Sequence, residues 1–413
     1  MIYTTKAYQE QDMNNPVPLT PKPDHVPAEL VVDYDYIRPD GLEEVGVYKA
    51  VKRLHDGPDI IWSPRHGGHW MVTRAEDVKF VQLNYEIFSH EEFMIPRTLM
   101  PLKPLPLAVD PPNHARYRAV INPGFMPGKV AKMRDDAREL TIELVEKLLP
   151  QGHCELLGDF ARVMPVTMFL RIVDLPLDRR EEFVEWGIAL MSSYDPAERL
   201  AAQIRVRDYL KTVLDERDNG DGDDLLTRVA AWRRNPRFQS EEEVLSMASL
   251  LFFGGLDTVA SEIAYIAHYL AQHPEQQRRL REEPEIIPAA CEEFLRRFGL
   301  SNTGRILTRD FEYKGVLFKK DEMIMVPNNL SGIDDREYAC PMDVDFDRNA
   351  PAHNTFGNGP HKCVGQGLAR AEIEIFLEEF VGRLPEFRLD PDRKNVEHCG
   401  SVPGFDELYL RWD

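Results

Sequence analysis

Cysteine is scarce in this chain, which has five copies scattered over 413 residues. They lie at positions 154, 291, 340, 363 and 399, and no two have the short spacing of a zinc site. The number is odd, so a disulfide framework is not expected. A glycine-rich fingerprint for a flavin or a nicotinamide nucleotide is also missing. The chain is therefore not expected to bind such a nucleotide itself.

Basic charge is in deficit, because 50 Lys and Arg face 70 Asp and Glu and give a formal net charge of -20. Nucleic acids and anionic membranes reward clustered Lys and Arg, so neither is expected as a main partner. The longest apolar run, near residues 250–256, is too short to span a bilayer, and the N-terminus does not resemble a signal peptide. These features predict a cytoplasmic protein without a membrane anchor.

The composition that remains is that of a large globular protein, with 43% hydrophobic and 29% charged residues. No stretch is polar and long enough to be a linker, so residues 1–413 are predicted to form one domain that includes an extended, proline-rich segment to about residue 40. Apolar periodicity predicts helices at 131–149, 180–196, 200–217 and 241–272, and short strands at 59–62 and 70–73. Residues 218–224 read as a solvated loop, with calcium binding the weaker interpretation.

The stretch FGNGPHKCVG at residues 356–365 puts one cysteine, Cys363, in a glycine-rich turn just before a helix. Glycines let the backbone turn sharply and approach a flat object closely. Backbone N–H groups and the positive end of the helix would stabilise a thiolate. The alternative interpretation is that Cys363 is a small buried hydrophobe. The combined spacing of Phe, Gly, His and Cys favours the interpretation that Cys363 is itself an anionic, thiolate ligand.

With Phe356, Gly359, Cys363 and Gly365 in the pattern F-x-x-G-x-x-x-C-x-G, the chain resembles the cytochrome P450 family. The resemblance implies a mainly α fold with a small β-rich lobe (α+β) and haem b as cofactor. It also implies that Cys363 is the thiolate ligand of the haem iron, where it favours O–O cleavage.

The segment 240–272 is the second feature, predicted as one helix of roughly 45–50 Å. Ser240 and Glu243 fit a capping box. Two glycines, 254 and 255, and the polar pair Asp257 and Thr258 interrupt its apolar face, at a helix-propensity cost of about 1 kcal/mol per glycine. A kinked core helix with a back-bonded threonine is the alternative. The stretch is similar to the family's oxygen-activation motif, which assigns proton delivery to Asp257 and Thr258.

Glu293 and Arg296 form an E-x-x-R pair on one helical face. Alone this is weak, because such surface pairs are common. In the family the pair is buried and meets an arginine before the haem loop, for which Arg348 is the candidate. The expected role is folding of the core beside the haem.

Haem propionates require basic donors, and a basic residue taken singly is more often a solvated charge. Arginine makes bidentate contacts to carboxylates, which favours Arg118 and Arg305. Thr303 stands where the resembling subfamily has an aspartate, so one propionate contact is expected to change. The resemblance implies these cofactor-binding residues: Cys363, His114, Arg118, Arg305, His361, Phe356 and Gly255.

The resemblance is closer to the bacterial camphor hydroxylase subfamily, and it covers most of the chain. The loop at 95–110 has no tyrosine to donate to a substrate ketone, and Leu102 lies near that position. Camphor is therefore not expected as the native substrate, and Lys103 is expected to face solvent. Matching positions gives a mostly apolar set of substrate candidates: Met94, Leu102, Leu250, Phe253, Ser301 and Val402.

The resemblance thus implies a monooxygenase that hydroxylates an unactivated C–H bond of a small terpenoid or norisoprenoid, ionone-like or camphor-like, with O₂. Electrons would come from NADH or NADPH through a reductase and a 2Fe-2S ferredoxin. The ferredoxin would dock on basic residues over the haem: Arg116, Arg118, Lys362 and Arg370. A haem-thiolate peroxygenase or isomerase and a non-catalytic haem-thiolate sensor are the alternatives; the Asp257–Thr258 pair favours the monooxygenase.

Overall fold

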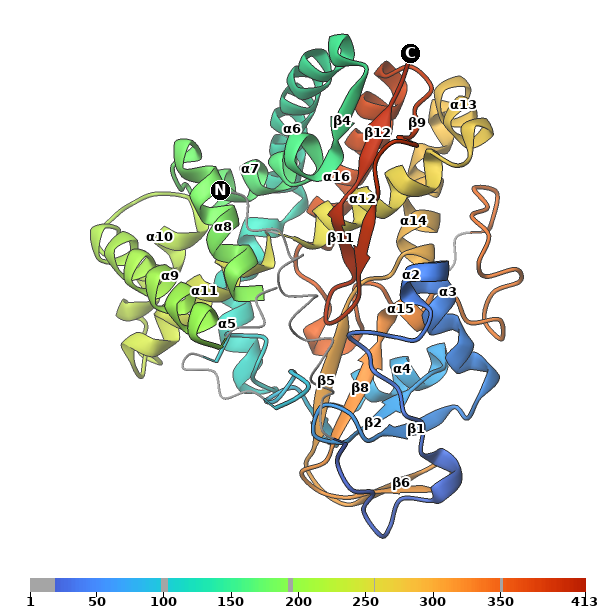
Figure 1. Ribbon diagram of the computed structural model, residues 1–413. Helices are drawn as coiled ribbons and strands as arrows, with labels where there is room; N and C mark the ends of the chain where they lie inside the picture. The colour runs from blue at the N-terminus through green and yellow to red at the C-terminus, as the bar shows by residue number, and fades with distance from the viewer. Residues whose placement is uncertain (1–18, 98–102, 192–195, 256, 350–351) are drawn as a thin grey trace.

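The computed structural model of the protein describes residues 19–97, 103–191, 196–255, 257–349 and 352–413. About 52% of the chain is helical. The helices, shown in Figure 1, are α2 (Leu42–Val45), α3 (Val47–Lys52), α4 (Ala75–Leu83), α5 (Asn113–Ile121), α6 (Pro127–Leu148), α7 (Val163–Ile172), α8 (Arg180–Met191), α9 (Pro196–Glu216), α10 (Leu225–Ala230), α11 (Glu241–Gly254), α12 (Thr258–Leu270), α13 (Pro274–Glu282), α14 (Ile287–Arg297), α15 (Asn328–Ser331) and α16 (Gln366–Ile375). The predicted mainly α fold is confirmed.

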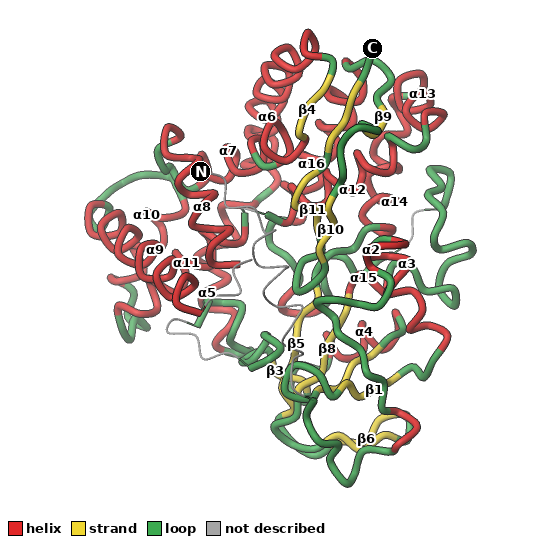
Figure 2. The backbone as a smooth tube through the Cα atoms, viewed as in Figure 1, coloured by secondary structure: helices red, strands yellow, loops and turns green. Residues whose placement is uncertain are grey.

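The strands form small sheets beside this helical mass. They are β1 (Ile60–Ser63), β2 (His69–Val72), β3 (Phe88–Ser89), β4 (His153–Glu155), β5 (Asn302–Leu307), β6 (Phe311–Tyr313), β7 (Val316–Phe318), β8 (Met323–Pro327), β9 (Arg388–Leu389), β10 (Val396–His398), β11 (Gly404–Glu407) and β12 (Tyr409–Arg411). The largest sheet has five strands in the order β1-β2-β8-β5-β3, and only β2 and β8 pair in parallel. Figure 2 shows this sheet in the lower part of the molecule, away from most helices.

The predicted elements agree with the structure to within a few residues, with one exception. The expected strands at 59–62 and 70–73 are β1 and β2, each displaced by one residue. The single helix expected over 241–272 is instead described as two helices: α11, whose C-cap residue is Gly255, and α12, whose N-cap residue is Asp257. Glycines and polar residues at the centre favour this interruption, because they weaken the helix and compete for its hydrogen bonds.

The capping box expected at Ser240 is not formed. Ser240 is the N-cap residue of α11, but its side chain makes no capping hydrogen bond. Glu243 accepts instead from the backbone N–H of Gln239 at 3.0 Å and from the indole of Trp232 at 3.1 Å. Glu243 therefore ties the start of α11 to neighbouring chain segments.

The loop at 218–224 ends as a helix cap, in agreement with the predicted solvated loop. The Asp224 carboxylate accepts from the backbone N–H of Thr227 at 2.9 Å and from Arg217, so it satisfies α10 and a guanidinium. Because Asp224 has these partners in the protein, its position is explained without a calcium ion.

Apolar side chains of three groups of elements form the core. One cluster lies between α6, α7, α12, α14 and α16, a second between α5 and α7 to α11, and a third behind the five-stranded sheet. One helical stretch, Glu241–Leu270, is long and apolar enough to cross a membrane by length and composition, but 59% of its most apolar window is buried in the molecule. A buried core helix passes the same test, so this is weak support for a membrane span.

Candidate active site

Cys363 lies in the turn between the short 3-10 segment Gly359–His361 and the start of α16. Gly357 and Gly359 have φ values of 70° and 68°, in the left-handed region that favours glycine. The backbone N–H of Cys363 donates to the Phe356 carbonyl at 2.8 Å and closes the loop. The predicted sharp glycine turn is therefore present, and it places Cys363 just before α16.

Backbone N–H groups of Gly365 and Gln366 donate to the Cys363 thiol, as the sequence predicted. Burial raises the pKa of this thiol, while the two amides and the guanidinium groups of Arg118 and Arg370 act against that rise. The pKa stays above its ordinary value, although the residue retains exposed surface. A coordinating metal ion deprotonates a thiol outright, so this environment suits a metal-bound thiolate.

The predicted propionate donors come together from three distant parts of the chain. His114 and Arg118 lie on α5, Arg305 on β5, and His361 just before Cys363. The His114 and His361 rings have centroids 4.5 Å apart. Asp110 is the carboxylate at this cluster, 3.4 Å from Nε2 of His361.

Burial disfavours the charged form of each basic group in this cluster. Burial lowers the pKa of Arg305 to about 9 and that of Arg118 below its usual value. Burial, followed by His361 and Arg118, lowers the pKa of His114 to about 4. Buried cations that so outnumber the acids facing them are stabilised by an incoming anion. The donor set therefore fits the two carboxylates of haem.

His90 belongs to the same cluster and was missed by the sequence analysis. Its ring is buried and stacks on His361 with centroids 4.4 Å apart, and its Nδ1 has no hydrogen-bond partner within the described chain. Burial, then Arg305 and His361, hold the pKa of His90 well below its ordinary value. No spacing signal could have found it, because it comes from the β3 end of the sheet.

Thr303 orients the side chain of Arg305. Its hydroxyl accepts from Nη1 of Arg305 at 3.0 Å, and the Gly304 carbonyl accepts from the same nitrogen at 2.7 Å. The residue that replaces an aspartate therefore orients Arg305 without neutralising it.

The break between α11 and α12 carries Asp257 and Thr258. Asp257 is the N-cap residue of α12 but makes no capping hydrogen bond, and Thr258 is exposed. The back-bond expected from Thr258 to a helix carbonyl is absent from the described residues. Both side chains are thus free for other contacts at the helix break.

The two glycines before the break differ in what they face. A methyl group on Gly255 would lie 2.4 Å from the Phe169 ring, whereas one on Gly254 would meet nothing within 4 Å. Gly255 was the predicted haem contact, but its lack of a side chain is explained by the packing of α11 on α7. Gly254 is the glycine that leaves open space for a flat group.

Three substrate candidates meet at β5, and all three are half-buried: Met94, Ser301 and Val402. The Gly304 N–H donates to the carbonyl of Phe93 at 2.7 Å, and the Asn302 N–H to that of Ser401 at 2.8 Å. These bonds hold their neighbours beside the strand. Leu250 and Phe253 lie half-buried on α11, and Leu102 lies outside the described residues. Lys103 is exposed, as expected.

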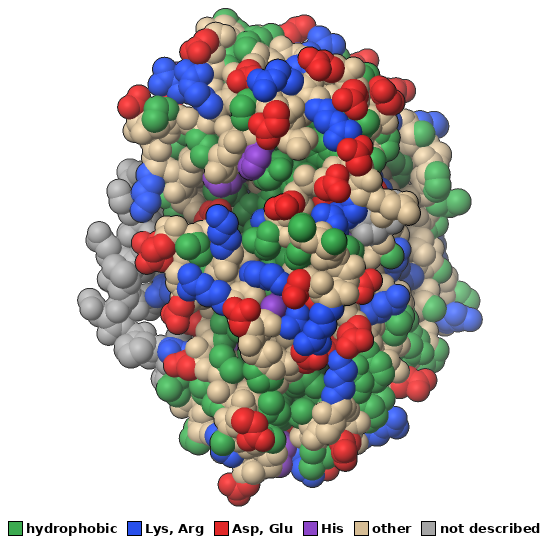
Figure 3. All heavy atoms as spheres, turned by 90° about the vertical axis from the view of Figure 1, so that its right-hand side faces the viewer, with side chains coloured by type: hydrophobic (Ala, Val, Ile, Leu, Met, Phe, Trp, Pro, Cys, Tyr) green, Lys and Arg blue, Asp and Glu red, His purple; other side chains and the backbone are tan. Residues whose placement is uncertain are grey.

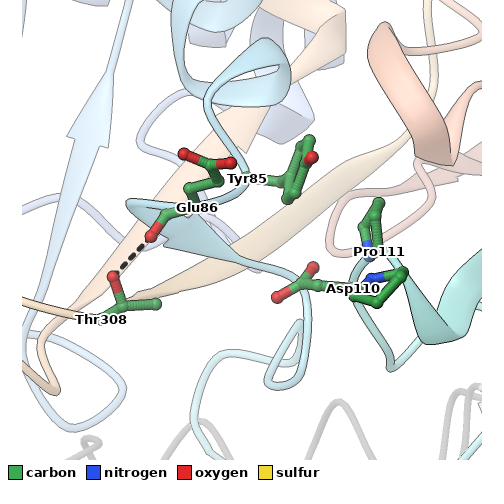
Figure 4. Close-up of a pocket in the computed structure, with 6 residues that line it drawn as sticks. Tyr85, Glu86, Asp110, Pro111 and Thr308 are labelled. Carbon is green, nitrogen blue, oxygen red and sulfur yellow. Dashed lines mark hydrogen bonds between the residues drawn. The ribbon is translucent and has the colours of Figure 1, made fainter.

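A separate pocket of about 400 Å³ lies beside the cation cluster, and Figure 4 shows its lining. The Thr308 hydroxyl donates to the Glu86 carbonyl at 2.7 Å along one wall, and Asp110 and Pro111 form the other. None of the predicted substrate residues lines it, and its mixed polar lining does not suit a hydrocarbon.

The E-x-x-R pair is buried as the resemblance implied. Glu293 accepts from Nε and Nη2 of Arg296 at 2.8 and 2.7 Å and from Nε of Arg348 at 3.1 Å. Arg296 is fully buried and also donates to the backbone carbonyls of Gly332, Pro341 and Asp343. The network fixes the segment that leads to the haem loop.

The expected basic docking patch is corrected in part. Arg116 is bound to Glu243 at 2.9 Å with 14% of its side chain exposed, so it is not an available surface cation. Arg118 is half-buried near Cys363, and Arg370 pairs with Glu292 and lies over the Phe356 ring at 4.6 Å. Lys362 alone of the four is exposed. Two of the four predicted cations, Arg116 and Arg370, are therefore already paired with acidic side chains of this chain.

The comparisons with known proteins agree with this site. The family model for cytochrome P450 matches residues 205–399. A probable cytochrome P450 127A1 from Sinorhizobium fredii is 32% identical over 406 residues, 96% of this chain and 98% of that protein. The structure of cytochrome P450 CYP101C1 is 35% identical with a TM-score of 0.86, covering 95% of this chain and all 100% of that one. For CYP101J2 the values are 30%, 0.85, 96% and 100%.

The chain belongs to the cytochrome P450 family. It is a bacterial-type oxidoreductase of the monooxygenase class that uses haem b, and the likeness to the camphor hydroxylase subfamily is confirmed.

Proposed function

We propose that the protein hydroxylates an unactivated C–H bond of a small terpenoid or norisoprenoid, with electrons from a 2Fe-2S ferredoxin. The observation that carries this proposal is the combination of an amide-supported thiol at Cys363 with a buried cation cluster and a broken helix bearing Asp257 and Thr258. We also propose that residues 1–413 form one domain and that the protein is cytoplasmic.

Cys363 would ligate the iron, and the cation cluster would hold the propionates through Arg118, Arg305, His114 and His361. When bound, the haem supplies oxygen binding and O–O cleavage, which a thiolate ligand favours. The protein's part is to keep the thiol aligned by the loop amides and to fix the propionates, so that the cofactor lies against the open side of Gly254.

Asp257 and Thr258 would move protons to the oxygen atom that leaves as water. A carboxylate and a hydroxyl at adjacent positions can pass a proton, and positioned proton transfer contributes about 10²–10⁴-fold to rate. The absence of a capping bond at Asp257 supports this role, because its oxygens are not committed to the helix end.

An apolar substrate is supported by the character of the lining candidates. Met94, Leu250, Phe253 and Val402 are half-buried, so they combine core contact with remaining accessible surface. Burial of a hydrocarbon against them contributes about 25 cal/mol per Å². Ser301 is the polar member, and its hydroxyl is the candidate donor to a ketone.

Ferredoxin docking is proposed around the exposed Lys362, with apolar neighbours rather than a wide basic patch. Leu83 and Met126 are 47% and 58% exposed. Leu83 lies 3.6 Å from the missing Cβ of Gly359 in the haem loop. On the face shown in Figure 3, acidic and basic side chains are interspersed instead of forming one basic patch. A small acidic protein would meet Lys362 through its charge and Leu83 and Met126 through apolar contact.

The test combines binding and turnover. Camphor and ionone-type ketones are titrated against the haem-loaded protein while the absorption shift for loss of the iron-bound water is followed. Binders are then incubated with NADH, a reductase and a ferredoxin, and products are identified. Hydroxylated product that requires the ferredoxin supports the proposal; ligand binding with no product under any donor would leave only a sensor.

A further inference from the structure

His398 faces the helix break from the β10–β11 hairpin. It is the last residue of β10 and pairs with Gly404, the first residue of β11, which packs on α12 as Figure 1 shows. A methyl group on Gly404 would lie 2.8 Å from the Ser261 hydroxyl and 3.1 Å from both Cε1 and Nε2 of His398. Gly404 therefore lies between the Cε1–Nε2 edge of this ring and Ser261 in the first turn of α12, which follows Asp257.

The opposite ring nitrogen is paired with an acid. Nδ1 of His398 lies 2.9 Å from a carboxylate oxygen of Asp406, and the two side chains are 29% and 20% exposed. This ion-pair contact turns the Nδ1 side of the ring to Asp406 and leaves Nε2 as the nitrogen available for proton transfer. Both groups retain enough exposure to exchange protons with water.

The charged groups around the ring come from every element that packs on it. They are Asp406 on β11, Asp257 at the helix break, Arg162 beside α7 and Glu397 on β10. Burial lowers the pKa of His398, and so does the nearby Arg162. Asp406 and then Asp257 raise it by more, so the pKa lies above its ordinary value. The ring is thus coupled electrostatically to the carboxylate at the break.

We propose that His398, oriented by Asp406, is a relay residue that returns protons from solvent to Asp257 during turnover. The inference rests on the proposed role of Asp257. Each turnover consumes substrate, O₂, two ferredoxin electrons and two protons, and yields the alcohol and water. In the relay step the Nε2–H bond breaks as an O–H bond forms on Asp257, and water then returns a proton to the ring.

The experiment compares three variants of the haem-loaded enzyme: His398→Gln, Asp406→Asn and the control His25→Gln. His25 pairs with Glu322 at 2.8 Å with exposures of 21% and 19%, which matches the His398 pair, but it packs on Trp70 in the five-stranded sheet. The readouts are product formed per NADH, oxygen consumption across pH, and the solvent isotope effect.

The wild type is expected to slow as pH rises through the elevated pKa of His398, because the protonated donor is lost. His398→Gln should lack this descending limb and lose about tenfold in rate below it, the low end of positioned proton donors. Asp406→Asn should move the limb to lower pH, because removal of the acid lowers the ring pKa. His25→Gln should behave as wild type.

A second measurement does not depend on activity. In the diamagnetic reduced carbon monoxide complex, NMR of the His398 ring should give a pKa above 6.5 that falls in Asp257→Asn. An unchanged pH profile in His398→Gln, or a ring pKa indifferent to Asp257, overturns the relay through His398. If Asp257→Asn slows turnover and His398→Gln does not, this inference is wrong while the proposed function stands. If neither slows it, the proton-delivery role proposed for Asp257 is wrong as well, while product formation still tests the proposed hydroxylation.

Discussion

Replacement of Glu293 by Gln perturbs the most deeply buried charged network described in the chain. The carboxylate accepts from Arg296, from Arg348 and from the backbone N–H of Asp345 at 2.9 Å. Glutamine keeps the shape but leaves two guanidinium groups without an anion, one of them fully buried. Loss of one partner from a buried pair destabilises by about 3–5 kcal/mol.

The assay is urea denaturation of the haem-loaded protein, followed by loss of the reduced carbon monoxide band. Because a bound cofactor makes unfolding depart from two-state behaviour, the midpoint is compared rather than an extrapolated free energy. With a urea dependence of about 3 kcal/mol per M for a large domain, a loss of about 3–5 kcal/mol should lower the midpoint by about 1 to 1.7 M.

The matched control is Glu143→Gln. Glu143 pairs with Lys147 at 2.5 Å on α6, with side chains 61% and 64% exposed. Solvent screens such an exposed pair, so the midpoint of Glu143→Gln should stay close to that of the wild type. Equal shifts in the two variants would refute the argument that burial decides the strength of the Glu293 network.

The remaining predictions concern the haem, the relay, the substrate and the backbone. Cys363→Ala should abolish the red-shifted band of the reduced carbon monoxide complex, and a retained band would exclude this ligand. Thr258→Ala should leave substrate binding intact but divert NADH electrons to peroxide, seen as a fall in product per NADH; unchanged coupling removes Thr258 from the relay. Leu102→Tyr should tighten camphor binding about 5- to 150-fold, because a buried ketone without a donor costs about 1–3 kcal/mol; tight, single-product camphor oxidation by the wild type would contradict this. Gly332→Ala should lower the thermal midpoint, because its methyl would lie 1.8 Å from the Arg296 carbonyl oxygen; an unchanged midpoint would mean that the backbone relaxes there.

Local patterns were readable from the sequence where the interacting groups are close along the chain. Cys363 and the Gly365 amide are two residues apart, and Glu293 and Arg296 are three apart on one helix, so spacing alone predicts their contact. The interruption of the long helix was also signalled, since glycines and an Asp-Thr pair weaken a helix wherever it lies. Only the separation into two helices was not foreseen.

Contacts between distant segments were decided by the tertiary structure alone. His90 stacks on His361 in the cation cluster, Arg116 is bound by Glu243, and His398 lies near the break that carries Asp257. The partners in each of these pairs are more than 100 residues apart along the chain. Periodicity reports which face of an element is apolar but not which element covers it. The candidates for the iron ligand and for proton delivery could therefore be predicted from short motifs. The charged groups that surround those candidates depend on how the hairpin, the sheet and the helices pack together.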